Sequence, residues 1–240
     1  GTVQPIESIS QVIQAVRQER AASGNKLPLY LHTDACQAAN YLPLLLHTLG
    51  VDMMTLNGGK MYGPKQSGVL AVRTGVVMRP QILGGGQERG LRSGTENVAG
   101  IIGLAVALEA AQAVRVTEAD RLTELQHYAV KRLLEAVEGV IINGSVHRTL
   151  QKESTMDANR MAHVLLQHRI PNNVHFSVPG YDNERLMMEL DERGIQCATG
   201  SACSASSDEP SHVLRALGIP DNEAQASLRI TMGRDTTKQA

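Results

Sequence analysis

The sequence has no tryptophan, and only one phenylalanine and five tyrosines among its 240 residues. Proteins that bind single-stranded nucleic acid usually stack the bases on aromatic side chains. The formal net charge is −1, so the chain also lacks the excess of Lys and Arg that attracts a phosphate backbone. We therefore expect no nucleic-acid partner.

Cysteine is also scarce. Cys36, Cys197 and Cys203 are too few and too scattered for a disulfide framework, which favours a reducing compartment. We expect the cytoplasm, or an organelle matrix in a eukaryotic cell, because the first residues lack the basic region and apolar core of a signal peptide. The apolar stretch at residues 101–114 stops short of a membrane-spanning length and carries Glu109, so we expect no membrane partner.

The residues that are present are those of a globular protein. Hydrophobic residues make up 42% of the chain and charged residues 20%, and its length suffices for one large or two modest domains. Helices and strands alternate in the first half, which predicts an α/β sheet, whereas the second half suggests a smaller α+β layer. We place the boundary near residue 112, giving domains at 1–112 and 113–240.

Hydrophobic periodicity and turn signals predict the individual elements. Strands are expected at residues 27–32, 51–56, 67–73, 140–144, 172–178, 195–199 and 227–233. Helices are expected at residues 5–24, 41–50, 95–114, 117–140, 158–169, 182–194 and 209–218.

Two residues near predicted strand ends indicate a cofactor. Asp34 follows the strand at 27–32, and Lys60 follows the strand at 51–56. A carboxylate that keeps a pyridine nitrogen protonated and a lysine that holds an aldehyde as a Schiff base suit pyridoxal phosphate. Gln37 lies three residues after Asp34 and faces the same way if the turn is helical. The alternative for Asp34 alone is a helix N-cap.

The glycines beside Lys60 support this hypothesis. Gly58 and Gly59 permit a tight turn whose backbone N–H groups can approach a phosphate. A P-loop is the competing interpretation, but the segment lacks the required spacing and the Ser or Thr after the lysine.

Two further residues have chemistry that their surroundings do not explain. Cys203 lies among Gly, Ser and Ala, a composition that predicts an exposed, mobile loop and a nucleophilic thiol. Zinc binding by Cys197 and Cys203 fails on spacing and ligand number, and we expect no metal site. Arg229 is embedded in an apolar strand and needs an anionic partner, either in a structural ion pair or as a substrate carboxylate.

Six segments together resemble a known family. They are "GTVQPI", "HTDACQAA", "GGKMYGPKQSGVLAVR", "GGGQERGLRSGTENV", "GSACSASSDEPSHVLRALG" and "SLRITMGRDTT". In this order they are similar to the cysteine desulfurases, in the class V aminotransferase group of fold-type I pyridoxal phosphate enzymes. The "GSACSAS" loop resembles the subclass that commonly serves iron–sulfur cluster assembly and tRNA thiolation.

The resemblance implies a role for each cofactor-binding residue. Lys60 would form the Schiff base and move protons, and Asp34 would pair with the pyridinium nitrogen. Gln37 would hydrogen-bond the ring oxygen, and Asn57 would donate to the phosphate. Thr95 would reach the phosphate of the neighbouring subunit in a homodimer.

The resemblance also implies the reaction. Arg229 would hold the carboxylate of L-cysteine. Cys203 would attack the substrate sulfur, keep it as a persulfide and release L-alanine. A sulfur-acceptor or scaffold protein would then take the sulfur.

The sequence departs from the family pattern in two ways. Asn57 and Gly59 stand where the family usually has Ser and His before the lysine. The matched segments also correspond to a C-terminal portion, with the remainder of the large-domain sheet and a small α+β domain. We therefore expect that this chain alone does not fold into an active enzyme, and that a longer chain or a separate one supplies the N-terminal half. The alternatives are a selenocysteine lyase or related pyridoxal phosphate enzyme, and an inactive fragment that binds partners.

Overall fold

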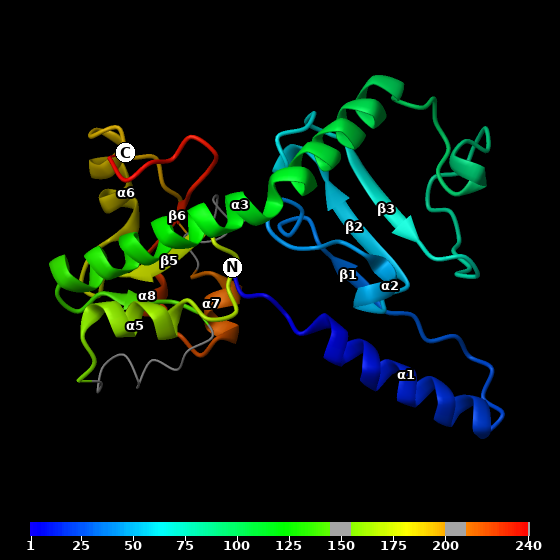
Figure 1. Ribbon diagram of the computed structural model, residues 1–240, viewed down its shortest axis with the longest axis horizontal. Coiled ribbons are helices and arrows are strands. Elements are labelled where there is room, and N and C mark those ends of the chain that lie inside the picture. The colour runs from blue at the N-terminus through cyan, green and yellow to red at the C-terminus, as the bar shows by residue number, and fades with distance from the viewer. Residues whose placement is uncertain (145–154, 200–209, 240) are drawn as a thin grey trace. The chain divides into compact units, whose positions relative to one another are not determined.

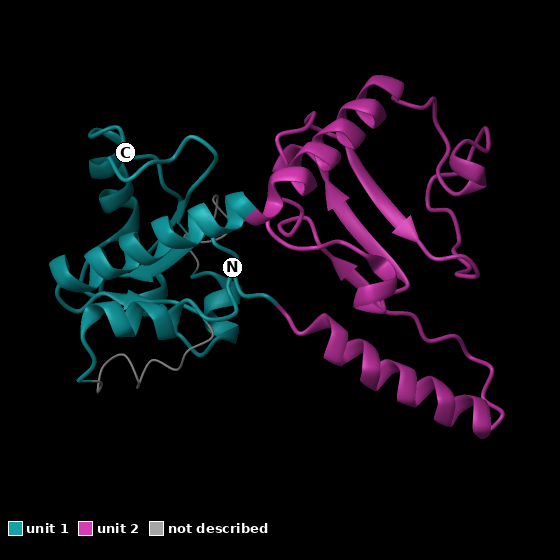
Figure 2. Ribbon diagram, in the orientation of Figure 1, with its two compact units in different colours: residues 1–3, 117–240 teal, residues 4–116 magenta. Residues whose placement is uncertain are grey.

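The computed structural model describes residues 1–144, 155–199 and 210–239. The chain forms two compact units, shown in Figure 2. Unit 1 comprises Gly1–Val3 and Thr117–Ala240, and unit 2 comprises Gln4–Val116. The boundary predicted at residue 112 and the division between the units both fall inside one helix, α3 (Val98–Ala136).

Unit 2 is built on a mixed sheet with the strand order β1-β2-β3 among its described residues, visible in Figure 1. β1 (His32–Asp34) runs parallel to β2 (Met53–Asn57), and β2 runs antiparallel to β3 (Gly68–Val72). The carboxyl ends of β1 and β2 therefore share one edge of the sheet. The mixed sheet and its helices confirm the predicted α/β class.

Helix α1 (Ile6–Ala22) agrees with the sequence expectation and is tied to the sheet by a buried carboxylate. Asp52, 6% exposed, forms an ion pair with Arg17 of α1. The same carboxylate accepts a hydrogen bond from the backbone N–H of Leu31 at 2.7 Å. Asp52 thus joins α1 to the segments that enter β1 and β2.

The core of unit 2 lies between this sheet and the loops that follow β1 and β2. Helix α2 (Leu46–Leu49) contributes partly buried leucines to it. The fully buried members of this core are Ala35, Ala39, Val51, Met54, Leu56 and Met61.

Helix α3 is longer than the sequence indicated. The two helices expected at 95–114 and 117–140 form one continuous helix, because no Gly or Pro breaks the join. Its start also differs: Asn97, not Thr95, provides the cap, with its side-chain oxygen accepting the N–H of Gly100 at 3.0 Å.

The first half of α3 packs on the loops of unit 2. Gln112 donates to the backbone oxygens of Ala39 at 2.6 Å and Leu42 at 3.1 Å. At Gly103 a Cβ would come within 2.5 Å of the Pro64 ring, so the absence of a side chain allows this close contact. Pro64 follows Lys60 by four residues, and α3 therefore supports the turn that carries the lysine.

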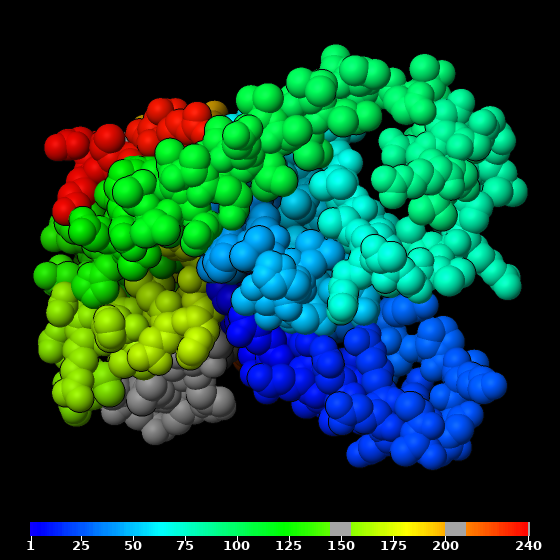
Figure 3. Space-filling model, turned by 45° about the vertical axis from the view of Figure 1, so that its right-hand side comes forward, coloured from blue at the N-terminus to red at the C-terminus, as the bar shows by residue number. Residues whose placement is uncertain are grey.

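The outer side of this same half carries an exposed apolar stripe. Its members are Val98, Ile101, Ile102 and Val106, between 48% and 65% exposed. Their spacing of three and four residues places them along one face of the helix. Atoms of α3, in green, are visible at the surface in the space-filling view of Figure 3.

Within the described residues, α3 is the one helix long and apolar enough to cross a membrane by length and composition alone. Core helices of globular proteins meet the same two criteria. The merging of the two expected helices explains why this length was not foreseen. The absence of a membrane partner stays a prediction.

Unit 1 contains an antiparallel sheet with the order β4-β5-β6 among its described residues. β4 (Ile141–Ile142) pairs with β5 (Asn173–Ser177), which pairs with β6 (Ser227–Thr231). The accompanying helices are α5 (Ala158–Leu165), α6 (Asn183–Asp191), α7 (His212–Ala216) and α8 (Asp221–Ala224). This arrangement agrees with the expected α+β layer.

Successive side chains along each strand point to opposite faces of the sheet, so one face is apolar and the other polar. Val174, Phe176 and Leu228 point into an apolar core. The opposite face, here called the polar face of the small sheet, carries Asn143, His175, Ser177, Ser227 and Arg229.

Two predicted strands were wrong. Residues 27–31 form no strand, and β1 begins only at His32; Leu27 is 72% exposed, so the apolar run is not a buried segment. Residues 195–199 contribute only an isolated bridge from Ala198 to Arg229. A short apolar run forms a strand only when a neighbouring strand pairs with it over several residues.

We predict that Gly103→Val lowers the free energy of unfolding by about 1–3 kcal/mol, because the added side chain meets Pro64. Chemical denaturation followed by circular dichroism measures the change. Ala105→Val, at an exposed position of the same helix, is the matched control and should change it by less than about 0.5 kcal/mol. Equal midpoints for both variants would contradict the close packing.

Candidate cofactor and substrate site

Asp34 is the last residue of β1 and stands at the carboxyl edge that β1 shares with β2. Its Oδ1 accepts the backbone N–H of Cys36 at 2.9 Å. Hydrogen bonds from the Cys36 thiol and from this N–H lower the pKa of Asp34, and the charge of Lys60 lowers it further. The carboxylate is therefore held ionised, as a partner of a pyridinium nitrogen must be.

Lys60 ends the short 3₁₀ turn Gly58–Lys60 that follows β2. The backbone N–H of Gly58 donates to the backbone oxygen of Ser67 at 2.8 Å. A Cβ at Gly58 would collide with the side-chain hydroxyl of Ser67. The side chain of Asn40 donates to the backbone oxygen of Lys60 at 2.9 Å. The turn is thus pinned on both sides while the Lys60 side chain stays exposed.

The expected phosphate cradle needs one correction. The N–H of Gly58 is used within the fold, so it cannot serve a ligand. In a 3₁₀ turn that spans Gly58–Lys60 the N–H of Lys60 bonds to the backbone oxygen of Asn57, three residues earlier. The N–H of Gly59 has no backbone partner among the described residues and is the amide of this turn that remains for an anion.

The residues at this edge fit pyridoxal phosphate by their chemistry. An ionised carboxylate and a primary amine lie close enough for the charge of Lys60 to lower the pKa of Asp34. Among the described residues Lys60 forms no ion pair, so its amine is not committed to a structural role. Gln37 and Asn57 are exposed amides near the same strand ends.

Thr95 lies elsewhere in unit 2, exposed and three residues before α3 begins. Its side chain has no hydrogen bond among the described residues. The structure contains one copy of the chain, so the contact of Thr95 with a neighbouring subunit stays a prediction.

Cys36 and Cys197 are poor nucleophiles in this structure. Burial raises the pKa of the Cys36 thiol to about 11, and its hydrogen bond to Asp34 adds to this effect. Burial also raises the pKa of Cys197, with the nearby Asp191 contributing. Cys203, the predicted nucleophile, lies outside the described residues.

Arg229 lies on β6 in unit 1, on the polar face of the small sheet. Its guanidinium makes no ion pair or hydrogen bond among the described residues. The structural ion pair that the sequence left open is therefore not found there, which favours the role of an anion-binding group.

Sequence reasoning missed the groups around Arg229. His175 is its cross-strand partner on β5, and the Asn143 side chain contacts both His175 Nδ1 at 3.0 Å and Ser177 Oγ at 2.8 Å. Alternation in the segment 172–178 could have placed His175 on the face of Arg229, had the pairing of the two strands been known.

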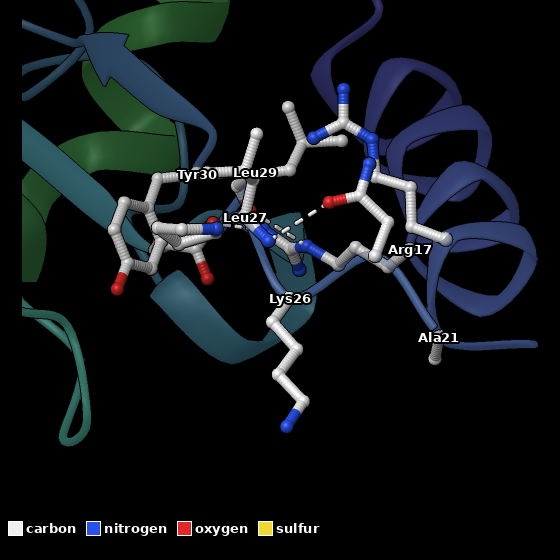
Figure 4. A pocket seen from close by; sticks show the side chains of 10 residues that line it. Arg17, Ala21, Lys26, Leu27, Leu29 and Tyr30 are labelled. Carbon is white, nitrogen blue, oxygen red and sulfur yellow. Dashed lines mark hydrogen bonds and ion pairs between the residues drawn. The ribbon is translucent and has the colours of Figure 1, made fainter. Parts of the chain in front are cut away.

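A cavity of about 270 Å³ in unit 2 lies apart from the predicted site residues. It is lined by the end of α1 and the segment before β1, including Arg17, Lys26 and Tyr30, as Figure 4 shows. The Arg17 guanidinium is already engaged by Asp52 and the Leu29 oxygen. We therefore assign Arg17 a structural role in this cavity and propose no ligand for it.

Curated relatives match the whole chain. It is 37% identical over 239 residues to the cysteine desulfurase IscS of Dictyoglomus turgidum and covers 53% of that protein. It is also 37% identical to cysteine desulfurase IscS 1 of Archaeoglobus fulgidus, of which it covers 54%. The chain thus spans about half the length of the curated relatives it matches.

Solved structures agree on the fold. A NifS-like protein matches with a TM-score of 0.79 and 30% identity, covering 100% of this chain and 54% of the other. A NifS-like protein from Rickettsia africae matches with a TM-score of 0.77 at 24% identity, covering 100% of this chain and 55% of the other. The fold is therefore that of fold-type I pyridoxal phosphate enzymes.

One protein-family model also matches the whole chain. It is the model for aminotransferase class-V, and it matches residues 1–240. The sheet edge with Asp34 and Lys60, the fold and this match lead to one conclusion: the chain belongs to the aminotransferase class-V family.

Proposed function

We propose that this chain forms part of a pyridoxal phosphate-dependent cysteine desulfurase. The observation that carries the proposal is the β1–β2 edge, where an ionised Asp34 lies close enough to the Lys60 amine for the charge of Lys60 to lower its pKa. The substrate class is taken from the curated relatives, which are named cysteine desulfurases. The cofactor, when bound, accepts electron density from the α carbon of the substrate.

The residues of this chain have separate tasks in the proposed reaction. Lys60 holds the cofactor and moves the proton at the substrate α carbon, and Asp34 keeps its negative charge beside the ring nitrogen. Gln37 and Asn57 orient the group by hydrogen bonds, and Arg229 binds the substrate carboxylate.

Cys203 accepts the sulfur. Its thiolate forms a bond to the substrate sulfur, and the bond between that sulfur and the β carbon breaks. A proton added at the β carbon completes L-alanine. The balance is L-cysteine plus the Cys203 thiol giving L-alanine plus the Cys203 persulfide, with no external oxidant.

The proposal extends to partners and compartment. We propose a homodimer in which Thr95 reaches the cofactor phosphate of the neighbouring subunit. A sulfur-acceptor or scaffold protein takes the persulfide sulfur for iron–sulfur cluster assembly or tRNA thiolation. The reaction belongs in the cytoplasm or an organelle matrix, where thiols stay reduced.

In an active protein that contains this chain, we predict that Lys60→Arg abolishes release of L-alanine from L-cysteine, because a guanidinium cannot carry the cofactor or accept the proton. Cys203→Ser should lose protein-bound sulfane sulfur while retaining the visible absorbance of the bound cofactor. Alanine release is measured by amino-acid analysis, and sulfane sulfur by its release with thiols.

Two matched controls sharpen this test. Lys65→Arg, on the same loop, and Cys36→Ser, at a buried thiol, should both leave persulfide formation in place. Loss of sulfane sulfur from Cys36→Ser, with Cys203→Ser unaffected, would contradict the assignment. Turnover of selenocysteine alone would favour a selenocysteine lyase.

We predict that the three thiols differ in their reaction with iodoacetamide at pH 8. A thiol with a pKa of about 11 is ionised to only about 0.1% at this pH, so Cys36 should react slowly and faster as the pH rises. Cys203 should be modified before Cys36, as measured by peptide mass spectrometry over time.

Protein unfolded in urea is the control, and all three thiols should then react alike. If Cys36 in the folded protein reacts as fast as in urea, the buried environment described for it is wrong.

A further inference from the structure

The polar face of the small sheet gathers positive and donor groups without an acid to balance them. His175 and Arg229 are cross-strand partners on β5 and β6, so their side chains lie side by side on this face. Arg169, in the segment before β5, donates to the backbone oxygen of Asn143. None of the three side chains forms an ion pair with an acid among the described residues.

Several of these donors lack an acceptor. The Nε of Arg169 is buried without a hydrogen-bond partner, and the Arg229 guanidinium has none among the described residues. Buried donors are normally paired, so the orphaned Nε of Arg169 favours a ligand that supplies the acceptor. The half-buried guanidinium of Arg229 adds a second positive charge close to His175, so the ligand that suits both arginines is an anion.

Asn143 orients the histidine ring. Its amide lies 3.0 Å from His175 Nδ1 and 2.8 Å from Ser177 Oγ. With the amide nitrogen donating to both, Nδ1 accepts, and Asn143 Oδ1 is left buried without a partner. The remaining ring hydrogen is then on Nε2, which has no partner among the described residues. Burial lowers the pKa of His175 to about 4, and the charges of Arg169, Arg229 and the Gly1 ammonium contribute, so the ring is neutral near pH 7.

A neutral ring beside Arg229 suits recognition of a carboxylate. Arg229 supplies charge and a planar pair of donors, while the His175 Nε2–H adds a neutral donor of fixed direction. All of these groups lie in unit 1.

We infer that His175, oriented by Asn143, is a specificity-determining residue that binds the carboxylate of the amino-acid substrate together with Arg229. The inference rests on the proposed function for the identity of that amino acid. The carboxylate site itself is a property of the polar face of the small sheet, and it can be tested without turnover.

Binding is tested by NMR of the histidine ring signals in purified protein that contains this chain, with His175→Gln used for assignment. L-alanine, the unreactive product, should move the His175 signal saturably and raise its pKa from about 4, because the anion offsets the two arginines. Ethylamine, which is L-alanine without its carboxyl group, should not move it. Arg229→Gln should abolish the effect of L-alanine.

Other outcomes of this titration contradict the inference. If ethylamine moved the His175 signal as much as L-alanine does, the carboxylate would not be the group that the site recognises. An equal response to chloride at the same concentration would show an unspecific anion effect. No response at His175, while L-alanine binds elsewhere in the protein, would also overturn the assignment.

Kinetics give an independent readout. His175→Leu should raise KM for L-cysteine roughly tenfold and change kcat by less than about twofold, because a hydrogen bond to a charged group is lost on binding. His175→Gln, which restores an N–H donor near the position of Nε2, should recover most of the affinity. His163→Leu, at an exposed site on α5, is the matched control and should leave both constants unchanged.

The two proposals fail in different ways. Saturable binding of L-alanine at His175 without turnover of L-cysteine would contradict the desulfurase and support the carboxylate site. Turnover of L-cysteine with an unchanged KM in His175→Leu would contradict the role of His175 and leave the desulfurase in place.

Discussion

The parallel pairing of β1 with β2 is the constraint on which the candidate site depends. Parallel strands end at the same edge, so the residue that closes β1 and the turn that follows β2 must be neighbours. Asp34 and Lys60 occupy these two positions, 26 residues apart in the sequence. The close approach of Gly58 to Ser67 and the packing of α3 on Pro64 then hold the turn at that edge.

The two units contribute different chemistry. Unit 2 offers a carboxylate, an amine and exposed amides, which suit a cofactor with a ring nitrogen, an aldehyde and a phosphate. Unit 1 offers Arg229 and His175 on the polar face of an antiparallel sheet, which suit a small carboxylate. Cys36, beside Asp34, is protonated and buried, so it helps keep the carboxylate ionised instead of reacting.

Sequence reasoning recovered the features that depend on local signals. Helix α1 and strand β3 follow from periodicity and from turn residues, which act within a few positions. Asp34 does close a strand, but that strand is His32–Asp34 and not the predicted one at 27–32. It failed where distant partners decide: residues 27–31 have the composition of a strand but no neighbour, and α3 continues through a predicted gap. The environment of His175 depends on strand register, which a single sequence does not reveal.

We propose that Lys60, near Asp34 at the shared end of β1 and β2, is the residue that carries the cofactor. The most direct test is to add pyridoxal phosphate to purified protein that contains this chain, reduce with borohydride and map the peptides by mass spectrometry. We expect the phosphopyridoxyl mass on Lys60, and its loss in Lys60→Arg. Modification of Lys65 on the same loop, or an even spread over exposed lysines, would contradict it.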